Sequence, residues 1–220
     1  LKAAGTRDIR PYGTGEGSVM EAFYRGGNIN GSSFELLNHR TGERVTVNWA
    51  LSGAHQAHNA AGAAAVADAF GISMQTIAEG LADCVLPGMR MKRTEHNGAT
   101  WLNDAYNANP DSMKATLNWL QEFADPEKLV LVLGDMREIG ELSQAVHREV
   151  LEKALADFPG ARIAAIGPEM VRAAQTLNNP QIRTWSDSQS AAEGVRALVK
   201  NGDLVFLKAS RGTRLELIEP

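Results

Sequence analysis

Hydrophobic and polar positions alternate in short runs over the first fifty residues of the chain. Residues 33–37 and 44–49 each have the pattern of a half-buried strand, and the turn-forming residues 39–42 lie between them. The alternating glycines of residues 13–17 are not followed by Gly-Lys-Ser or Gly-Lys-Thr, so we interpret them as a loop between strands rather than a phosphate-binding loop. Residues 1–50 are therefore predicted to be rich in β-structure.

An alanine-rich stretch follows and predicts two helices. Residues 55–70 have the composition of a tightly packed helix, and Gly71 supplies a stop signal at its end. Ser73 is the expected N-cap of a second helix that continues to Asp83.

A Leu-Pro-Gly sequence centred on Pro87 then breaks the chain. We place a domain boundary there, which gives a first domain of residues 1–86 and a second domain of residues 87–220. No Met precedes Leu1, and residues 214–220 have the pattern of the first turns of a helix. We therefore expect the sequence to be a fragment of a longer protein.

After Pro87 the pattern becomes a regular alternation of strands and helices joined by tight loops. Asn97-Gly98 is a strong signal for a two-residue hairpin turn, and Asn109 is expected to cap a helix that begins at Pro110. The expected strands are 90–95, 100–104, 129–133, 162–166, 182–184 and 204–207, and the expected helices are 109–123, 143–158, 169–177 and 188–200. Such alternation is typical of an α/β fold with a mostly parallel sheet covered on both faces.

Polar residues follow the carboxyl ends of the predicted strands, where α/β sheets bind ligands. They are Asp104, Asp135, Gly167 and residues 208–211. The carboxylate of Asp104 can accept hydrogen bonds from the vicinal hydroxyls of a ribose, or it can satisfy backbone amides in a well-capped loop. The sequence leaves both interpretations open.

Residues 208–214 place three cations and two hydroxyls at a strand end and a helix start. Cations are unfavourable at a helix N-terminus unless an anion is present, so this segment is a candidate site for a carboxylate or phosphate. The charged loop that begins at Asp135 is instead typical of a solvated connection, and His147 is expected to be exposed on a helix of mixed charge. His55 and His58 share a helix face, but no neighbouring carboxylate or cysteine completes a metal site.

Composition narrows the function classes. The 220 residues include 22 Lys and Arg against 26 Asp and Glu, a net charge of −4, and acidic residues outnumber basic ones on both sides of Pro87. We therefore expect no nucleic-acid partner. The single cysteine, Cys84, excludes a disulfide scaffold, no apolar run could span a bilayer, and the first ten residues lack a signal-peptide core. We expect a soluble, cytoplasmic chain with no membrane partner.

Five segments occur in a characteristic order. They are G-A-H-Q-A-H-N at 53–59, L-P-G-M-R-M at 86–91, N-D-A-Y-N-A-N-P-D-S-M at 103–113, G-D-M-R-E-I-G-E at 134–141 and K-A-S-R at 208–211. Together they resemble the Mur ligase family of ATP-dependent amide-forming enzymes of peptidoglycan synthesis. The resemblance covers nearly the whole chain. It implies that residues 1–86 are the end of a central ATP-binding domain and residues 87–220 a Rossmann-like C-terminal domain.

The resemblance also implies a nucleotide site. Asn59 matches the family residue that contacts adenine, Arg90 the arginine that faces the ATP phosphates, and Asp104 the aspartate that binds ribose. Gln56 stands where the family usually has an asparagine that makes a second adenine contact.

Lys208, Ser210 and Arg211 fall where the K-G-S-R segment of the family faces the peptide substrate. Ala209 replaces the usual glycine of that segment, which raises the question of how closely the backbone can approach there.

The resemblance implies a specific reaction. ATP phosphorylates the terminal carboxylate of UDP-N-acetylmuramoyl-tripeptide, and the amine of D-alanyl-D-alanine attacks the acyl phosphate. The phosphate-binding loop, Mg²⁺ ligands and modified lysine of the family belong upstream of this sequence, so we expect the fragment alone to be inactive, and a monomer. The alternative is a Rossmann-like module without catalysis that binds a nucleotide or a carboxylate. An NAD-dependent oxidoreductase is disfavoured, because no G-x-G-x-x-G follows a predicted strand.

Overall fold

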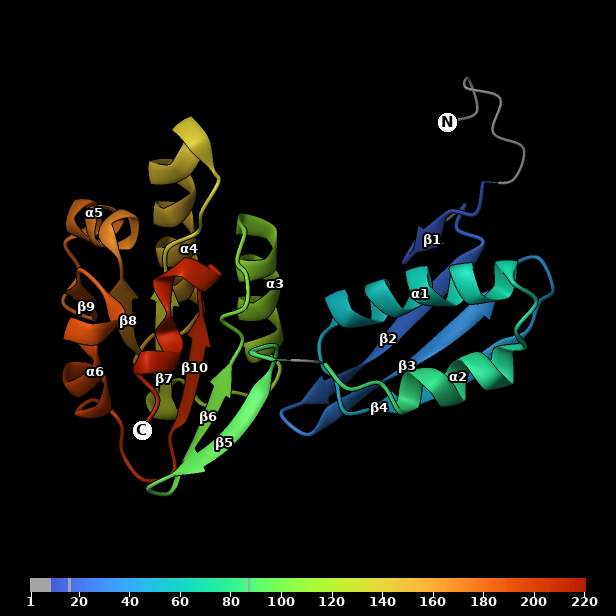
Figure 1. Cartoon of the computed structure of the whole chain (residues 1–220), viewed down its shortest axis with the longest axis horizontal. Helices are drawn as coiled ribbons and strands as arrows, with labels where there is room; N and C mark the ends of the chain where they lie inside the picture. The colour runs from blue at the N-terminus through green and yellow to red at the C-terminus, as the bar shows by residue number, and fades with distance from the viewer. Residues whose placement is uncertain (1–8, 16, 87) are drawn as a thin grey trace. The chain divides into compact units, whose positions relative to one another are not determined.

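The computed structural model describes residues 9–15, 17–86 and 88–220, whose helices and strands are shown in Figure 1. The chain forms two compact units, one ending at Val85 and the other beginning at Leu86. Pro87, at the predicted boundary, lies outside the described residues. What the two units correspond to in a longer protein stays a prediction.

The first unit is a four-stranded sheet with two helices packed on it (Figure 1). Strands β2, β3 and β4 are antiparallel, and the short strand β1 is parallel to β2. The elements are β1 (Tyr12–Gly13), β2 (Met20–Asn28), β3 (Gly31–Asn38), β4 (Arg44–Trp49), α1 (Ala54–Ala69) and α2 (Met74–Ala82). The predicted β-rich start is confirmed. Strand β2 was not predicted, because its sequence mixes apolar residues with glycines and charges and has no clean alternation.

The helix signals of the first unit are confirmed. Ser73 caps α2, since its hydroxyl accepts a hydrogen bond from the Thr76 backbone N–H. Gly71 follows α1 with a φ of 78°, in the left-handed region that favours glycine. The buried face of α1 consists of alanines, which let the helix lie close to the sheet: Ala57, Ala60, Ala61, Ala64 and Ala65.

The second unit is a six-stranded sheet in the order β5-β6-β10-β7-β8-β9. All neighbouring strands are parallel except the β5–β6 hairpin, so the predicted α/β fold with a mostly parallel sheet is confirmed. The strands are β5 (Lys92–His96), β6 (Ala99–Asn103), β7 (Leu129–Gly134), β8 (Arg162–Ile166), β9 (Ile182–Trp185) and β10 (Leu204–Lys208). The helices are α3 (Pro110–Leu120), α4 (Ser143–Asp157), α5 (Pro168–Leu177) and α6 (Ser188–Arg196).

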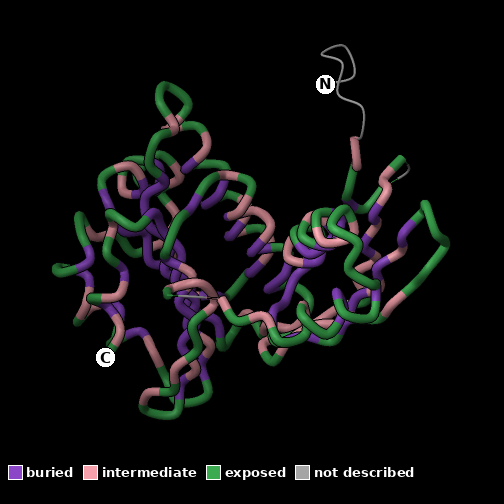
Figure 2. The backbone as a smooth tube through the Cα atoms, turned by 45° about the vertical axis from the view of Figure 1, so that its right-hand side comes forward, coloured by how far each residue is buried: buried purple, intermediate pink, exposed green. Residues whose placement is uncertain are grey.

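Both faces of this second sheet are covered. Val205 and other residues of one face pack with Ala191 and Val195 of α6. On the opposite face Phe206 packs against Trp119 of α3, and α3, α4 and α5 lie side by side. Figure 2 shows the resulting buried strands enclosed by more exposed helices and loops. The core is strongly apolar, which explains why the unbroken hydrophobic run of β7 predicts its position well.

Two local signals of the second unit are confirmed in detail. Asn97 and Gly98 have φ values of 51° and 74°, as expected for the mirror-image turn of a tight hairpin. Asn109 caps α3: its side chain accepts from the Ser112 N–H, and the Ser112 hydroxyl accepts from the Asn109 N–H.

The end of the chain differs from its prediction. Instead of the first turns of an α-helix, residues after β10 form two short 3₁₀ turns, η4 (Arg211–Thr213) and η5 (Leu215–Leu217). Arg214 separates them with a φ of 60°, which no right-handed helix can contain. Leu215 and Ile218 are thereby buried against the α6 face of the sheet.

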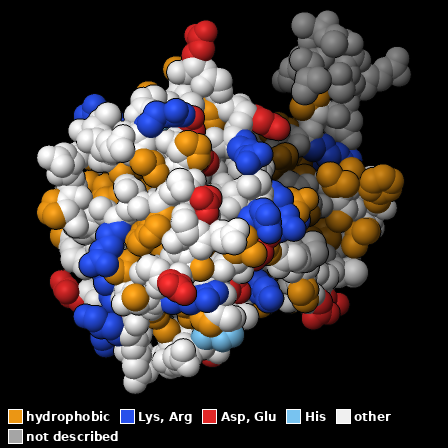
Figure 3. Space-filling model, turned by 60° about the vertical axis from the view of Figure 1, so that its left-hand side comes forward, with side chains coloured by type: hydrophobic (Ala, Val, Ile, Leu, Met, Phe, Trp, Pro, Cys, Tyr) orange, Lys and Arg blue, Asp and Glu red, His pale blue; other side chains and the backbone are white. Residues whose placement is uncertain are grey.

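The outer surface is mixed in character. Figure 3 shows one face, where Lys and Arg side chains are interspersed with acidic and apolar ones. Among the described residues, no helix has the length and apolarity needed to cross a membrane.

Candidate functional site

The loops after β6, β10 and β7 meet at the carboxyl edge of the second sheet, because these three strands are neighbours. The Asp104 N–H donates to the Leu207 carbonyl over 2.8 Å, and the Ser210 N–H donates to the Asp135 carbonyl over 3.0 Å. These two bonds hold the three loops together, and they bring four of the six predicted site residues, Asp104, Lys208, Ser210 and Arg211, into one part of the fold.

Asp104 and Lys208 form an ion pair at the centre of this edge. The Lys208 ammonium donates to Oδ2 of Asp104, and only 5% of the lysine side chain and 18% of the aspartate side chain are exposed. A buried ammonium needs such a partner, because an unpaired charge out of water is costly. Within the described residues the carboxylate bonds Lys208 and no backbone amide, so the loop-capping interpretation of Asp104 does not hold. Its second oxygen, Oδ1, has no protein partner among these residues.

Arg90 joins the same edge through Tyr106. The guanidinium carbon of Arg90 lies 4.1 Å from the centroid of the Tyr106 ring, a cation–π contact, and the Tyr106 N–H donates to the Met89 carbonyl over 3.1 Å. Arg211 reaches the same segment, with Nη1 3.2 Å from the Met89 sulfur and 3.6 Å from a Glu216 carboxylate oxygen. Sequence reasoning missed Tyr106 as a support for Arg90.

Ser210 is almost fully buried and connects three loops. Its hydroxyl accepts from the Arg137 N–H over 2.9 Å and is 3.3 Å from the Ala108 carbonyl, to which it donates. The neighbouring Ala209 fits without a glycine at its position because Gly134 faces it: a Cβ on Gly134 would lie only 2.7 Å from the Ala209 methyl. The close approach therefore depends on the glycine at the end of β7.

Asn59, the sixth predicted residue, belongs to the first unit. It lies exposed on α1, and its amide nitrogen is 3.5 Å from the side-chain oxygen of Gln56. His58, on the same helix, packs its ring against Tyr12, with ring centroids 5.5 Å apart. Among the described residues no group of three His, Cys, Asp or Glu side chains gathers as a metal site.

The prediction of a solvated loop after β7 is wrong for its first residues. Asp135 and Met136 are buried, with 8% and 2% of their surface exposed. The Asp135 carboxylate accepts from the backbone N–H groups of Met170 over 2.8 Å and Glu169 over 3.3 Å. It caps α5 from outside, because the N-cap of that helix is Gly167, which has no side chain. Burial raises the pKa of Asp135, and the bond from Met170 opposes that rise.

The prediction of an exposed His147 is also wrong: the residue is fully buried. Its Nε2 is 2.8 Å from the Met136 backbone nitrogen and its Nδ1 is 2.7 Å from the Ser143 carbonyl. A carbonyl only accepts and an N–H only donates, so the ring is neutral, with its proton on Nδ1. Burial lowers the pKa of His147. The spacing to the buried Val150, Leu151 and Ala154 of α4 could have placed it on the inner helix face.

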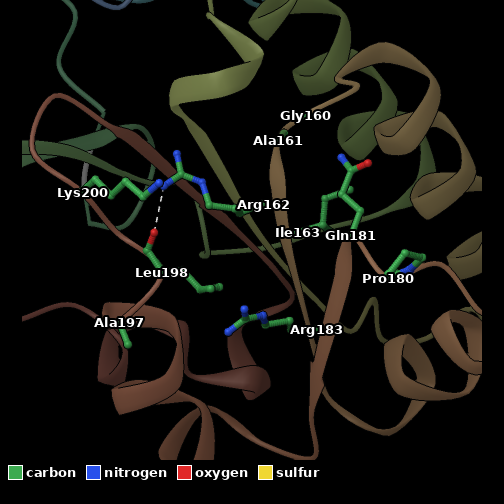
Figure 4. A pocket seen from close by; sticks show the side chains of 10 residues that line it. All are labelled: Gly160, Ala161, Arg162, Ile163, Pro180, Gln181, Arg183, Ala197, Leu198 and Lys200. Carbon is green, nitrogen blue, oxygen red and sulfur yellow. Dashed lines mark hydrogen bonds between the residues drawn. The ribbon is translucent and has the colours of Figure 1, made fainter.

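A cavity of about 380 Å³ lies at the opposite edge of the sheet, at the start of β8 and β9 (Figure 4). Arg162 enters it, but its guanidinium donates to both carboxylate oxygens of Asp203, at 2.7 and 2.9 Å, and to the Leu198 carbonyl at 2.8 Å. Arg183 and Lys200, which also line it, are exposed. None of the predicted site residues lines this cavity.

The carboxyl edge thus gathers a carboxylate and several cations where an α/β sheet binds anionic ligands. The chain belongs to the Mur ligase family: residues 89–211 match the family described as "Mur ligase, glutamate ligase domain". Within that family it is similar to UDP-N-acetylmuramoyl-tripeptide–D-alanyl-D-alanine ligases. It is 33% identical over 174 residues to the ligase of Bacillus subtilis (strain 168), which covers 76% of this chain and 38% of the relative. The resemblance predicted from the sequence is confirmed.

A second relative agrees with this placement, and two solved structures share the fold. The Treponema pallidum ligase is 33% identical over 174 residues, covering 77% of this chain and 37% of the relative. MurF from Acinetobacter baumannii superposes with a TM-score of 0.84 at 26% identity, over 99% of this chain and 47% of that one. MurF ligase from Thermotoga maritima in complex with ADP shares the fold, with a TM-score of 0.75 at 24% identity over 92% and 45% of the two chains. The chain spans less than half the length of these relatives.

Proposed function

We propose that this chain is part of an ATP-dependent ligase that joins D-alanyl-D-alanine to UDP-N-acetylmuramoyl-tripeptide in peptidoglycan synthesis, in the cytoplasm. Relatives at 33% identity carry the name of that reaction. Because the chain covers 37–38% of those relatives, the activity belongs to a longer protein. Under this proposal the first unit is the end of a central ATP-binding domain, and the second is the C-terminal domain.

The observation that carries the proposal is the pair of Asp104 and Lys208 at the carboxyl edge of the sheet. Lys208 fixes one carboxylate oxygen, and the other is available to accept from the two ribose hydroxyls of ATP. Hydrogen bonds to a carboxylate are stronger than those between neutral groups, which makes Asp104 a selective contact for a diol. Lys208, predicted for the peptide side, thereby acts on the nucleotide side through Asp104.

The surrounding cations suit the remaining charged groups. The guanidinium carbon of Arg90 lies over the Tyr106 ring, and the guanidinium N–H groups can donate to phosphate oxygens. Arg211 is exposed on the same edge and could bind a carboxylate of the peptide substrate, with Ser210 supporting the loop below it. Asn59 is proposed to contact adenine from the first unit.

The reaction needs water to be excluded, because an acyl phosphate hydrolyses readily. The complete enzyme must therefore shield the acyl phosphate from water while it orients the attacking amine. Mg²⁺ is expected with ATP, but the described residues gather no set of three ligands for it. Its ligands are predicted to lie in the upstream part of the protein.

The test is a ligase assay on the full-length protein encoded around this sequence. With ATP, UDP-N-acetylmuramoyl-tripeptide and D-alanyl-D-alanine, we expect the pentapeptide product and equimolar phosphate. Omission of D-alanyl-D-alanine should remove the product. A full-length protein that binds ATP but forms no product would favour the alternative, a non-catalytic nucleotide-binding module.

A further inference from the structure

Three consecutive backbone N–H groups after β7 donate to three different elements. The Asp135 N–H donates to the Ile166 carbonyl of β8 over 3.1 Å, and the Arg137 N–H donates to the Ser210 hydroxyl over 2.9 Å. Between them, the Met136 N–H donates to Nε2 of His147 on α4 over 2.8 Å. The conformation of this loop therefore depends on the sheet on one side, on the K-A-S-R segment on the other, and on a single side chain in the middle.

We infer that His147 and Asp135 are positioning residues that fix the loop of residues 134–137 and, through Ser210, the adjacent Arg211, which is proposed to bind a carboxylate of the peptide substrate. The inference rests on the proposed function for the identity of that substrate. Neither residue is assigned a contact with a ligand. Each acts through a backbone group of the loop.

The His147 contact has no substitute in the fold. Met136 is 2% exposed, so its N–H has no access to bulk water if the imidazole is removed. An unsatisfied buried N–H forces the loop to rotate toward another acceptor. The next amide, that of Arg137, would rotate with it and lose its bond to Ser210, which also connects to Ala108.

Asp135 fixes the same loop from the other side. Its carboxylate accepts from the first turn of α5, while its own carbonyl accepts from the Ser210 N–H over 3.0 Å. A Cβ on Gly167 would collide with this carboxylate, which therefore fills the place of the missing N-cap side chain. Loss of the carboxylate would free the start of the loop as well as the start of the helix.

The imidazole must be neutral for this arrangement. Its Nδ1–H donates to the Ser143 carbonyl, so Nε2 carries the lone pair that accepts from Met136. The charged groups that act on it are Asp135, which favours protonation, and Arg172 of α5, which disfavours it. Glu169, also on α5, accepts from the Ser143 hydroxyl and faces the same side of α4. A proton on Nε2 would place two hydrogen-bond donors, the imidazole N–H and the Met136 N–H, against each other across the 2.8 Å contact. Their repulsion would release the loop.

Two substitutions at His147 test its role as a hydrogen-bond acceptor separately from the volume that its side chain fills. His147→Gln keeps an oxygen that can accept from Met136, whereas His147→Leu fills the space without an acceptor. The control is Val150→Ala, which creates a cavity one turn along the buried face of α4 and leaves the loop contacts intact.

In the full-length ligase, His147→Leu should lower kcat/KM for the two peptide substrates by about 10- to 100-fold, while the KM for ATP stays close to wild type. His147→Gln should recover most of the loss, and its activity should lack the acid step that protonation of His147 gives the wild-type pH profile. Equal losses for ATP and the peptide substrates, or a folded His147→Gln as impaired as His147→Leu, would overturn the inference.

A second measurement does not depend on ligase activity. In the 220-residue chain, the imidazole nitrogen chemical shifts measured by NMR should show that His147 is neutral, with its proton on Nδ1. Amide exchange at Met136 and Arg137 should accelerate in His147→Leu and remain slow in Val150→Ala, after correction for global stability. A proton on Nε2 at neutral pH, or equal acceleration in both variants, would contradict the positioning role whether or not the protein is a ligase.

Discussion

Lys208 and Asp104 stand 104 positions apart in the sequence, yet the ammonium of one bonds the carboxylate of the other at the carboxyl edge of the sheet. The pairing of β6 with β10 places these two residues side by side. Asn103 pairs with Leu207, and Asp104 and Lys208 are the residues that follow them in the sequence. An aspartate that was a candidate ribose ligand is thus also the partner of a buried cation.

Substitution of Asp104 should affect binding and folding together. Asp104→Ala should weaken nucleotide binding about 10- to 150-fold in the full-length enzyme, through the loss of hydrogen bonds to a charged acceptor. It should also lower the free energy of unfolding by about 1–3 kcal/mol, because Lys208 is left buried without a partner. Isothermal calorimetry with ATP and urea unfolding measure the two effects.

Asp104→Asn is the matched control for that experiment. The amide oxygen can still accept from Lys208 but carries no charge, so part of the stability should return, while an NH₂ group replaces the free oxygen and cannot accept from ribose. Wild type should prefer ATP to 2′-deoxy-ATP, and both variants should lose that preference. A variant that retained it would rule out the ribose contact.

The 220-residue chain alone should release no phosphate from ATP above the background rate. A γ-phosphate needs a cradle of backbone amides and a metal with its ligands. Those parts are predicted upstream, and the described residues gather no metal-ligand cluster. A phosphate-release assay with ATP and both substrates checks this, and turnover by the purified chain would contradict it.

Stability should fall with pH below neutrality because of His147. Burial depresses its pKa, so the unfolded chain takes up a proton near pH 6.5 that the folded chain does not, and the contribution of the neutral ring is lost as the pH falls. Between pH 7.5 and 5.5 the free energy of unfolding should therefore fall, by at most about 1.4 kcal/mol for a single group whose unfolded pKa is 6.5.

Asp135 has the opposite effect on the pH dependence of the free energy of unfolding. Its raised pKa means that the folded state gains a proton first on acidification, which relieves the burial of its charge. Comparison of wild type with His147→Gln therefore separates the contribution of His147 to the pH dependence of stability from that of Asp135. Urea unfolding of this variant should depend less on pH than wild type between pH 7.5 and 5.5, and parallel pH curves would exclude the assignment.

Gly134→Ala should destabilise the second unit by about 1–3 kcal/mol, because the new methyl would collide with Ala209 at 2.7 Å and with Thr213 at 2.8 Å. Addition of Ala209→Gly should recover part of the loss, which a double-mutant cycle measures. Gly80→Ala, at a helical position with nothing within 4 Å, is the control and should instead stabilise by a few tenths to about 1 kcal/mol. Additive effects of the first two changes would mean that the methyl groups do not meet.

Local sequence signals predicted much of this fold. Asn97-Gly98 and Asn109 act within a few residues of themselves, and both form the predicted turn and cap. The unbroken apolar run of β7 is by itself enough to identify a buried strand. The same reasoning missed strand β2, because its bulge between Tyr24 and Gly27 interrupts the alternation of apolar and polar residues that marks a strand.

The site was less accessible to such reasoning, because its contacts join distant parts of the chain. Ser210 reaches Ala108 across 102 positions and Arg137 across 73. The burial of His147 depends on which face of α4 meets the sheet, which the mixed charges of that helix obscure. Sequence could name Asp104 and Lys208 as candidates, but only the pairing of β6 with β10 brings their side chains together.

The capping of α5 by Asp135 implies an order of events during folding. The N-cap of α5 is Gly167, and the carboxylate that accepts from Met170 in the first turn belongs to Asp135, 35 positions before Met170 and directly after β7. A β8–α5 segment emerging without β7 would keep frayed, unsatisfied amides at its start. Helix α5 can reach its final stability only after β7 and β8 have paired, so its formation reports on the docking of those two strands.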